Sequence, residues 1–318
     1  LAKVKERKDQ LVGGSVEGLT AALKNEKNID LYNGQASFTD NKTVQINGEN
    51  ITADKIFINV GGRARVPEEF EKVDYLTNEG ILELTELPEH LVIVGGSYIG
   101  LEFGQMFSRF GSKVTIVERG ERLIAREDED VSSNIQEILE DEGINFRMNA
   151  NCLGAKQEGE KQIKVQLDCD ETEPNEVTGS HLLLAVGRVS NADTLNLEAT
   201  DIKTDKRNHI QVNDYLETDA EGVYALGDCN GKGAFTHTSV HDFQIAHGNL
   251  FENKDKKSSD RILAYGLYID PPLGRAGMTL AQAKEAYKNV KVAERPMSKV
   301  ARAKEKGETN GFMRIVID

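Results

Sequence analysis

Apolar residues recur along the chain in two patterns, as short continuous runs and as positions spaced by three or four residues. The opening stretch, up to about Leu23, is charged and periodic enough to predict a helix. Short strands are expected to follow at residues 29–31, 36–38, 43–46 and 50–52, with a hairpin turn at Asn47-Gly48. The pattern therefore predicts that the chain begins with one helix and a group of short strands.

The clearest pattern lies between residues 91 and 117. Residues 91–94 form a run typical of a buried strand, and apolar residues then recur at helical spacing up to Phe110. Gly111 predicts the end of that helix, and residues 114–117 form a second buried strand. This order predicts one β-α-β unit.

Further runs extend this alternation of strands and helices. Helices are expected at residues 131–139, 236–250 and 280–287, and strands at residues 55–60, 144–146, 163–167, 182–186, 222–226 and 311–317. Gly61-Gly62 follows the run at 55–60, and glycines there allow the backbone to pass close to another group. The predicted class is α/β.

The turn Val94-Gly-Gly-Ser-Tyr-Ile-Gly100 lies between the first strand and the helix of the β-α-β unit. Gly95 permits a tight turn, Gly100 lets the helix approach the strand, and the helix start offers free N–H groups to a pyrophosphate. Ser97 stands where the dinucleotide consensus has its middle glycine. Its Cβ hinders the close approach of a pyrophosphate to the backbone, whereas its hydroxyl can donate a hydrogen bond to a phosphate oxygen. A structural turn without a ligand is the alternative, which the context of strand, helix and Glu118 disfavours.

Glu118 ends the second strand, 18 residues after Gly100. A carboxylate there can bind both ribose hydroxyls and repel a 2′-phosphate, which favours NAD over NADP. Arg119 and Arg122 lie close by, and either guanidinium could reach a 2′-phosphate and offset that repulsion. The prediction is NAD(P)H, with NAD favoured by Glu118.

Two more groups are candidates for chemistry. Tyr98 and Glu102 are spaced i, i+4, so both can lie on one helix face above the nucleotide, or they are a solvated pair. Gly227-Asp228 ends a strand where ligands of α/β sheets bind, although an aspartate there can equally cap a turn.

Three histidines, His237, His241 and His247, suggest a metal cluster at first sight. No carboxylate or cysteine completes a zinc motif, so no metal site is predicted. Hydrolase elbows, Walker loops and paired catalytic carboxylates do not occur in the sequence, which leaves electron transfer through cofactors.

Composition narrows the partners. The formal net charge is −14 without a basic tract, which argues against nucleic acid. No apolar run approaches the ~18 residues of a membrane helix, and the first residues lack the apolar stretch of a signal peptide, so a cytoplasmic protein is expected. Cys152, Cys169 and Cys229 are too few and too scattered for a disulfide framework, and we treat them as ordinary thiols.

Five motifs together resemble the pyridine nucleotide-disulfide oxidoreductase family over nearly the whole chain. They are Ile56-Phe-Ile-Asn-Val-Gly-Gly-Arg63, Leu91-Val-Ile-Val-Gly-Gly-Ser-Tyr-Ile-Gly-Leu-Glu-Phe103, Ala185-Val-Gly-Arg188, Gly222-Val-Tyr-Ala-Leu-Gly-Asp228 and Pro271-Pro-Leu-Gly-Arg-Ala-Gly-Met278. Arg126-Glu-Asp-Glu-Asp130 and the Pro-Pro-Leu-Gly-Arg stretch are most similar to the bacterial mercuric-reductase-like and dihydrolipoamide dehydrogenase-like branch.

The resemblance implies two cofactors, FAD and NAD(P)H, and a set of residues for each. The nicotinamide nucleotide would be held by Gly95, Gly96, Ser97, Tyr98, Ile99, Gly100, Glu102, Glu118 and Gly187. FAD would be held by Gly34, Ala36, Gly61, Gly62, Gly227, Asp228, Phe235, Thr236 and His237. Tyr98 and Glu102 are the expected catalytic residues, with Tyr98 as a lid that moves aside for the nucleotide, and Asp228 would bind the ribityl chain.

The implied architecture is a pair of doubly wound Rossmann-like domains of the three-layer ββα type, with a partial α+β dimerisation domain. We expect residues 1–86 and 191–258 to be the two parts of a partial FAD domain, 87–190 the NAD(P) domain and 259–318 the dimerisation domain. Three family features, the first G-x-G-x-x-G strand, the C-x-x-x-x-C disulfide and the His-Pro-Thr segment, do not occur in this sequence. We therefore expect a fragment whose intact parent is a homodimer.

The expected function is hydride transfer from NAD(P)H to FAD and on to a disulfide or thiol, a metal ion or an oxidant. Two alternatives remain open: a nucleotide-binding fragment without redox activity, and a cysteine-independent NADH oxidase or transhydrogenase.

Overall fold

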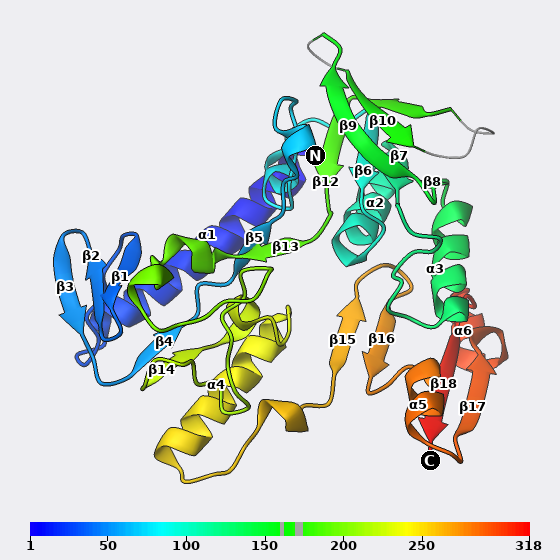
Figure 1. The fold of residues 1–318 in the computed structure, drawn as a ribbon. Coiled ribbons are helices and arrows are strands. Elements are labelled where there is room, and N and C mark those ends of the chain that lie inside the picture. Colours follow the sequence, from blue (N-terminus) through cyan, green and yellow to red (C-terminus); the bar gives the residue numbers. More distant parts are fainter. Residues whose placement is uncertain (160–161, 169–173) are drawn as a thin grey trace. The chain divides into compact units, whose positions relative to one another are not determined.

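The structure is a computed structural model that describes residues 1–159, 162–168 and 174–318 (Figure 1). The chain divides into two compact units, each built from separated segments. The first unit contains Leu1–Arg7, Ala64–Gly187 and Leu263–Asp318, and the second contains Lys8–Arg63 and Arg188–Ile262. The domain boundaries that we expect near residues 87, 190 and 259 stay predictions.

The centre of the first unit is a parallel sheet with strand order β12-β6-β7-β8. Its elements are β6 (His90–Val94), α2 (Tyr98–Phe110), β7 (Lys113–Val117), α3 (Glu129–Asp141), β8 (Asn145–Arg147) and β12 (His181–Leu184). Leu91 and Ile93 are fully buried against Leu101 and Phe107 of α2. The predicted β-α-β unit is confirmed, and Gly111, in the left-handed region with φ 105°, ends α2 as expected.

A second sheet of the first unit is antiparallel, with strand order β11-β10-β9. Its strands are β9 (Asn151–Gln157), β10 (Ile163–Asp168) and β11 (Glu176–Gly179). Ile163, Val165 and Leu167 alternate with more exposed residues and are all buried, which confirms the strand predicted from that alternation.

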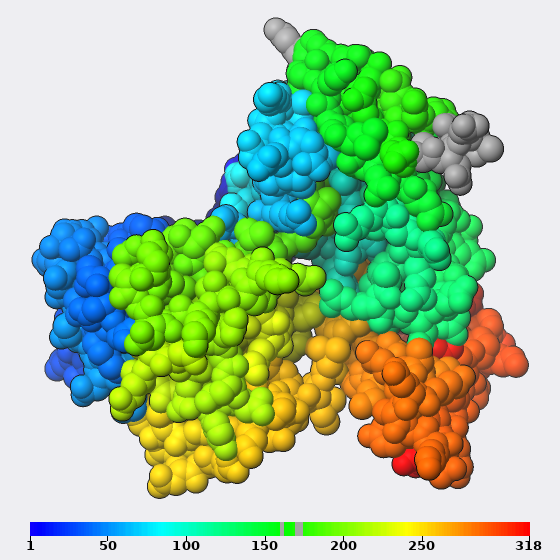
Figure 2. All heavy atoms as spheres, in the orientation of Figure 1, coloured from blue at the N-terminus to red at the C-terminus, as the bar shows by residue number. Residues whose placement is uncertain are grey.

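The last segment of the first unit is built from two antiparallel strand pairs and two short helices. Its elements are β15 (Ala264–Leu267), β16 (Leu273–Ala276), α5 (Leu280–Ala286), β17 (Lys291–Pro296), α6 (Ala301–Lys306) and β18 (Phe312–Ile317). Thr279 and Gln282 form a capping box at the start of α5. Atoms of this segment, orange to red in Figure 2, lie at the surface, where Met313, Ile315 and Ile317 of β18 are exposed.

The second unit contains a three-stranded antiparallel sheet, two strand pairs and α4. The elements are β1 (Ala36–Asp40), β2 (Thr43–Ile46), β3 (Glu49–Thr52), β4 (Ile56–Ile58), β5 (Gly62–Ala64), β13 (Arg188–Ser190), β14 (Val223–Ala225) and α4 (Thr236–Phe251). β14 runs parallel to β4, and β13 pairs with β5. Helix α1 (Ala2–Asn25) begins in the first unit and continues into the second.

The strand predicted at residues 29–31 is wrong. The chain has no regular structure there, and Ile29 and Leu31 are exposed. Charged and polar residues surround this short apolar pair, so it has no partner strand to supply hydrogen bonds and no core to enter.

Candidate nucleotide-binding site

The turn between β6 and α2 is packed so closely that side chains do not fit at its glycines. Gly95 has φ +114°, and a Cβ on it would lie 2.8 Å from the carbonyl carbon of Ala185. A Cβ on Gly96 would lie 2.7 Å from Leu123, and one on Gly100 would collide with the carbonyl of Gly95. Glycine is therefore needed at Gly95 and Gly100, where backbone atoms block a side chain, whereas at Gly96 the nearest atom is the movable end of Leu123.

The start of α2 has no side-chain cap. Ser97 is the N-cap residue in an extended conformation, and its side chain makes no capping hydrogen bond. The first N–H groups of a helix need acceptors from outside the helix, and the helix dipole favours a negative one. A pyrophosphate fits this end of α2 on both counts.

Glu118 follows β7 and reaches across to the same turn. Its Oε2 accepts a hydrogen bond from the N–H of Gly96 at 2.7 Å, and its Oε1 accepts one from the N–H of Gly120 at 2.8 Å. The side chain is half-buried, and each carboxylate oxygen keeps a further lone pair. A carboxylate held in this way can accept from ribose hydroxyls.

The other residues expected at the nucleotide lie in the same unit. Gly187 follows β12 and adopts φ +112°. Of the two arginines that could favour a 2′-phosphate, Arg122 donates a hydrogen bond to the carbonyl of Ala125 at 3.0 Å, whereas Arg119 is exposed.

Tyr98 and Glu102 both face the segment that contains β15. The ring of Tyr98 meets that of Tyr265 edge-on, with centroids 5.5 Å apart. Glu102 Oε1 accepts a hydrogen bond from the N–H of Tyr268 at 2.8 Å. Burial raises the pKa of Glu102, and the hydrogen bond from Tyr268 offsets part of that rise.

The same face of α2 continues to Gln105 and Arg109. Gln105 exchanges hydrogen bonds with the backbone of Asp270, at 2.8 Å and 2.7 Å, and Arg109 forms an ion pair with the Asp270 carboxylate at 2.7 Å. Residues 98, 102, 105 and 109 thus form one stripe at helical spacing that fastens α2 to residues 265–270. The i, i+4 relation of Tyr98 and Glu102 could be read from the sequence, but their partners could not.

The residues expected at FAD lie in the second unit. Gly227 and Asp228 begin a short 3-10 helix (Gly227–Asn230) directly after β14, and the Asp228 carboxylate lies 3.9 Å from Arg188 Nε. A Cβ on Gly62 would lie 2.8 Å from the carbonyl oxygen of Val189, so backbone segments approach closely here. Asp228 is partly exposed, as a carboxylate that binds hydroxyls must be.

Three further FAD candidates, Phe235, Thr236 and His237, lie at the start of α4. Phe235 is the N-cap residue and makes no side-chain capping bond, and its ring stacks on that of His237 with centroids 5.3 Å apart. Thr236 and His237 are exposed. An uncapped helix start and a flat aromatic pair fit a phosphate and a ring system. Gly34 and Ala36 precede and begin β1, and Gly61 follows β4 with φ +66°.

Asp242 was missed from the sequence. It lies in α4 and is fully buried, and its Oδ2 accepts hydrogen bonds from the N–H of Gly227 at 2.8 Å and from Asn230 Nδ2 at 2.9 Å. Its Oδ1 is paired with Arg261. The sequence did contain one signal for this role. Asp242 lies on the same helix face as the apolar Ile245, and a charged residue on a buried face must be paired with other polar groups.

The described histidines and cysteines that the sequence singled out have partners or surroundings within the protein. Arg261 Nε donates a hydrogen bond to His241 Nδ1 at 3.0 Å, and His247 lies beside Glu252. Within the described ranges, no group of three or more metal-binding side chains is close enough to hold an ion. Cys152 and Cys229 are free thiols, and burial raises the pKa of Cys152 to about 12; Cys169 lies outside the described residues.

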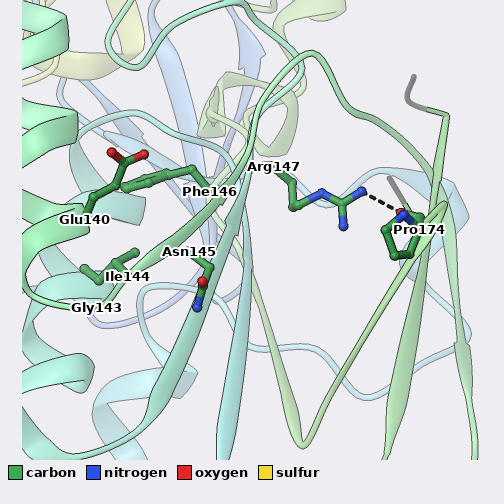
Figure 3. Close-up of a pocket in the computed structure, with 7 residues that line it drawn as sticks. All are labelled: Glu140, Gly143, Ile144, Asn145, Phe146, Arg147 and Pro174. Atoms are coloured by element: carbon green, nitrogen blue, oxygen red, sulfur yellow. Dashed lines mark hydrogen bonds between the residues drawn. The ribbon is translucent and has the colours of Figure 1, made fainter. Parts of the chain in front are cut away.

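The first unit contains a hollow that the residues of the glycine turn do not line. It has a volume of about 530 Å³ and lies beside β8, where Arg147 donates a hydrogen bond to the carbonyl of Pro174 at 2.5 Å (Figure 3). None of the residues expected to hold a cofactor lines it. We therefore place no ligand there.

Comparison with known proteins identifies the family of the chain. The family model described as pyridine nucleotide-disulphide oxidoreductase matches residues 2–246, and its dimerisation domain matches residues 263–318. The chain belongs to this family.

Relatives in this family resemble the chain over most of its length. A mercuric reductase of Staphylococcus aureus is 34% identical over 320 residues, which cover 100% of this chain and 58% of the relative. The probable pyridine nucleotide-disulfide oxidoreductase RclA of Escherichia coli is 34% identical over 308 residues, 93% of this chain and 68% of the relative. The chain thus spans little more than half the length of the first of these relatives.

The fold of this family is also confirmed. The solved structure of RclA from Escherichia coli, titled as an HOCl-induced flavoprotein disulfide reductase, superposes with a TM-score of 0.92 at 33% identity, covering 100% of this chain and 73% of that one. The predicted mixed α/β fold with Rossmann-like parallel elements is correct. Family members depend on FAD and take electrons from NAD(P)H. In the part of the chain that the structure describes, no helix is both long and apolar enough to cross a membrane.

Proposed function

We propose that this chain carries the nicotinamide-nucleotide site and much of the flavin site of an FAD-dependent oxidoreductase, with NADH preferred over NADPH. When bound, the two cofactors would supply hydride transfer from NADH to the flavin and, from there, reduction of a disulfide, a metal ion or an oxidant. The observation that carries the proposal is the close-packed glycine turn with Glu118 bonded across it.

The residues of the turn divide the work of binding. Gly95 and Gly100 let the backbone N–H groups of α2 approach a pyrophosphate, and the hydroxyl of Ser97 adds a further donor. Glu118 is held in place by Gly96 and Gly120, so it loses little freedom on binding ribose hydroxyls. Tyr98, the first residue of α2, is the proposed lid above this site.

The second unit supports the flavin half of the proposal. Asp228, at the end of β14, offers a carboxylate to the hydroxyls of a ribityl chain, and the uncapped start of α4 offers N–H groups to a phosphate. The alternatives are a nucleotide-binding fragment without turnover and a cysteine-independent NADH oxidase or transhydrogenase. Both alternatives share the nucleotide turn with the main proposal. In the first no electrons are transferred, and in the second they reach their acceptor without redox cysteines.

We also propose that the intact protein is a homodimer. The match of residues 263–318 to a dimerisation domain supports this assembly, as do the exposed apolar residues Met313, Ile315 and Ile317 on β18.

Nucleotide binding tests the proposal directly. The purified chain should bind NADH more tightly than NADPH in calorimetric titrations. Glu118→Gln should shift the ratio of the two dissociation constants toward NADPH by about tenfold, because hydrogen bonds to a charged group contribute about 1.5–3 kcal/mol and the repulsion of a 2′-phosphate is lost.

Glu121→Gln is the matched control, because Glu121 is a nearby exposed carboxylate. That variant should leave the ratio unchanged. Failure of the wild-type chain to bind either nucleotide would count against the proposed function as a whole.

A further inference from the structure

The ring of Tyr98 is held by two side chains from outside α2. Tyr265 of β15, which is 6% exposed, meets it edge-on with an interplanar angle of 86°. The guanidinium carbon of Arg126 lies 4.9 Å from the centre of the Tyr98 ring. Edge-on aromatic pairs and cation-π contacts both stabilise one orientation of a ring, so Tyr98 has a preferred resting position.

Tyr265 is itself fixed by a buried charged pair. Its hydroxyl donates a hydrogen bond to the Glu127 carboxylate. The other oxygen of Glu127 accepts from Arg275 Nη1 at 2.9 Å, and the two side chains are only 1% and 11% exposed. Burial, followed by the neighbouring Glu127, raises the pKa of Tyr265, so its hydroxyl stays protonated and remains a donor.

This arrangement resists movement at Tyr265. Glu127 has a partner on both oxygens, and removal of either partner would leave a buried carboxylate only half satisfied. The guanidinium above the Tyr98 ring belongs to Arg126, an exposed residue that can move with the ring. A ring that must move would therefore leave Tyr265 behind and break the edge-on contact.

We propose that Tyr265, fixed by Glu127 and Arg275, is a positioning residue that holds the Tyr98 lid in its resting place and thereby weakens NADH binding. The proposal rests on the proposed function, in which the nucleotide displaces Tyr98. A contact made only in the resting state raises the apparent dissociation constant by the factor by which it favours that state. The segment Leu263–Asp318 thus sets the affinity of a nucleotide turn that lies elsewhere in the sequence.

The test is the affinity of the full chain for NADH, followed through the fluorescence of the nucleotide. Tyr265→Leu removes the aromatic contact and should tighten NADH binding by about three- to tenfold, the range that one edge-on aromatic pair accounts for. Tyr265→Phe keeps the ring but loses the hydroxyl anchor, and should tighten binding by about twofold. Tyr75→Leu is the control, because Tyr75 is a half-buried tyrosine of the same unit that packs in a different core cluster; it should leave the affinity unchanged.

The same change in a Tyr98→Ala background separates positioning from a general structural effect. If Tyr265 acts through Tyr98, Tyr265→Leu should no longer alter NADH affinity in that background. An equal gain in both backgrounds, or wild-type affinity in both Tyr265 variants, would overturn the inference while leaving the proposed function intact. Absence of NADH binding by the wild-type chain would overturn both.

Discussion

Each unit contains a glycine turn that follows a buried parallel strand, and the two turns are fastened in different ways. The turn after β6 is bonded to Glu118, a half-buried carboxylate from the neighbouring strand. The turn after β14 is bonded to Asp242, a fully buried carboxylate from α4 that also pairs with Arg261. A half-buried carboxylate can still meet a ligand, whereas a fully buried one with three partners can only hold the backbone.

The carboxylates proposed to bind ligands thus differ in burial from the structural carboxylate of Asp242. Asp228 lies one residue from the backbone that Asp242 holds, so its position depends on a buried network that it does not join. Glu118 is suited to both tasks, because it holds Gly96 and Gly120 and keeps lone pairs for the ligand that we propose. Substitutions at the turn after β14 should therefore lower mainly the free energy of unfolding, and substitutions at the turn after β6 should weaken mainly nucleotide binding.

The largest effect is expected from Asp242→Asn. Asparagine keeps one acceptor for Gly227 but removes the charge that Arg261 faces in a buried site, where loss of one partner costs about 3–5 kcal/mol. Urea unfolding followed by circular dichroism measures the loss. Asp193→Asn is the control, because the Arg63–Asp193 pair at 2.6 Å is exposed and should contribute about 1 kcal/mol or less. Equal losses in the two variants would remove the distinction between the buried and exposed carboxylates.

A smaller loss of stability, accompanied by loss of binding, is expected from Gly95→Ala. The new Cβ would meet the carbonyl group of Ala185 at a backbone angle that alanine rarely adopts, at a cost of about 1–3 kcal/mol. The shifted turn should weaken NADH binding by about tenfold, which corresponds to about 1.4 kcal/mol.

Gly143→Ala provides the matched control for Gly95→Ala. Gly143 also has a positive φ, +84°, but nothing lies within 4 Å of an added Cβ. This variant should lose about 1–2 kcal/mol of stability through its backbone angle alone and keep its NADH affinity. Calorimetric titration of both variants decides the matter, and a matching loss of affinity at Gly143 would show that strain, and not the turn, weakens binding.

The elements around the first turn were predictable because their signals are local. Residues 91–94, Gly111 and residues 114–117 mark strand, helix end and strand within one short stretch, and the structure confirms all three. The strand predicted at residues 29–31 failed because apolar residues alone do not supply a partner. The hairpin of β15 and β16 was missed although the turn residues Asp270-Pro271-Pro272 lie between its two strands, because neither strand shows a clear apolar alternation of its own.

The partners of the candidate site were less predictable than its glycines. Gly95, Gly100 and Glu118 occupy positions that a strand-turn-helix pattern assigns from the sequence alone. Tyr265 and Asp242 acquire their importance only through contacts with residues far away in the chain. A single sequence does not specify such contacts, because many buried positions could offer the same hydrogen bond.

The smallest effect is expected from Glu102→Gln, and its sign follows from burial. Glu102 has a pKa raised above the ordinary value of 4.5, so between that value and the raised one the folded chain binds more protons than the unfolded chain. Stability should therefore fall as pH rises through this window and stay lower above it. Glutamine keeps an acceptor for the N–H of Tyr268 but cannot ionise, so the variant should lose this pH dependence and gain slightly at neutral pH, by less than about 1 kcal/mol because the side chain is half-exposed.

Thermal unfolding of Glu102→Gln and the wild-type chain from about pH 4 to about pH 7 measures this difference. Glu121→Gln is again the control, since an exposed carboxylate should leave the profile parallel to that of the wild type. If the Glu102→Gln profile is also parallel, the hydrogen bond from Tyr268 fully compensates the burial of the carboxylate. Glu102 would then resemble Asp242 at the second turn, whose buried charge is matched by its hydrogen-bond partners, more than it resembles Glu118 at the first.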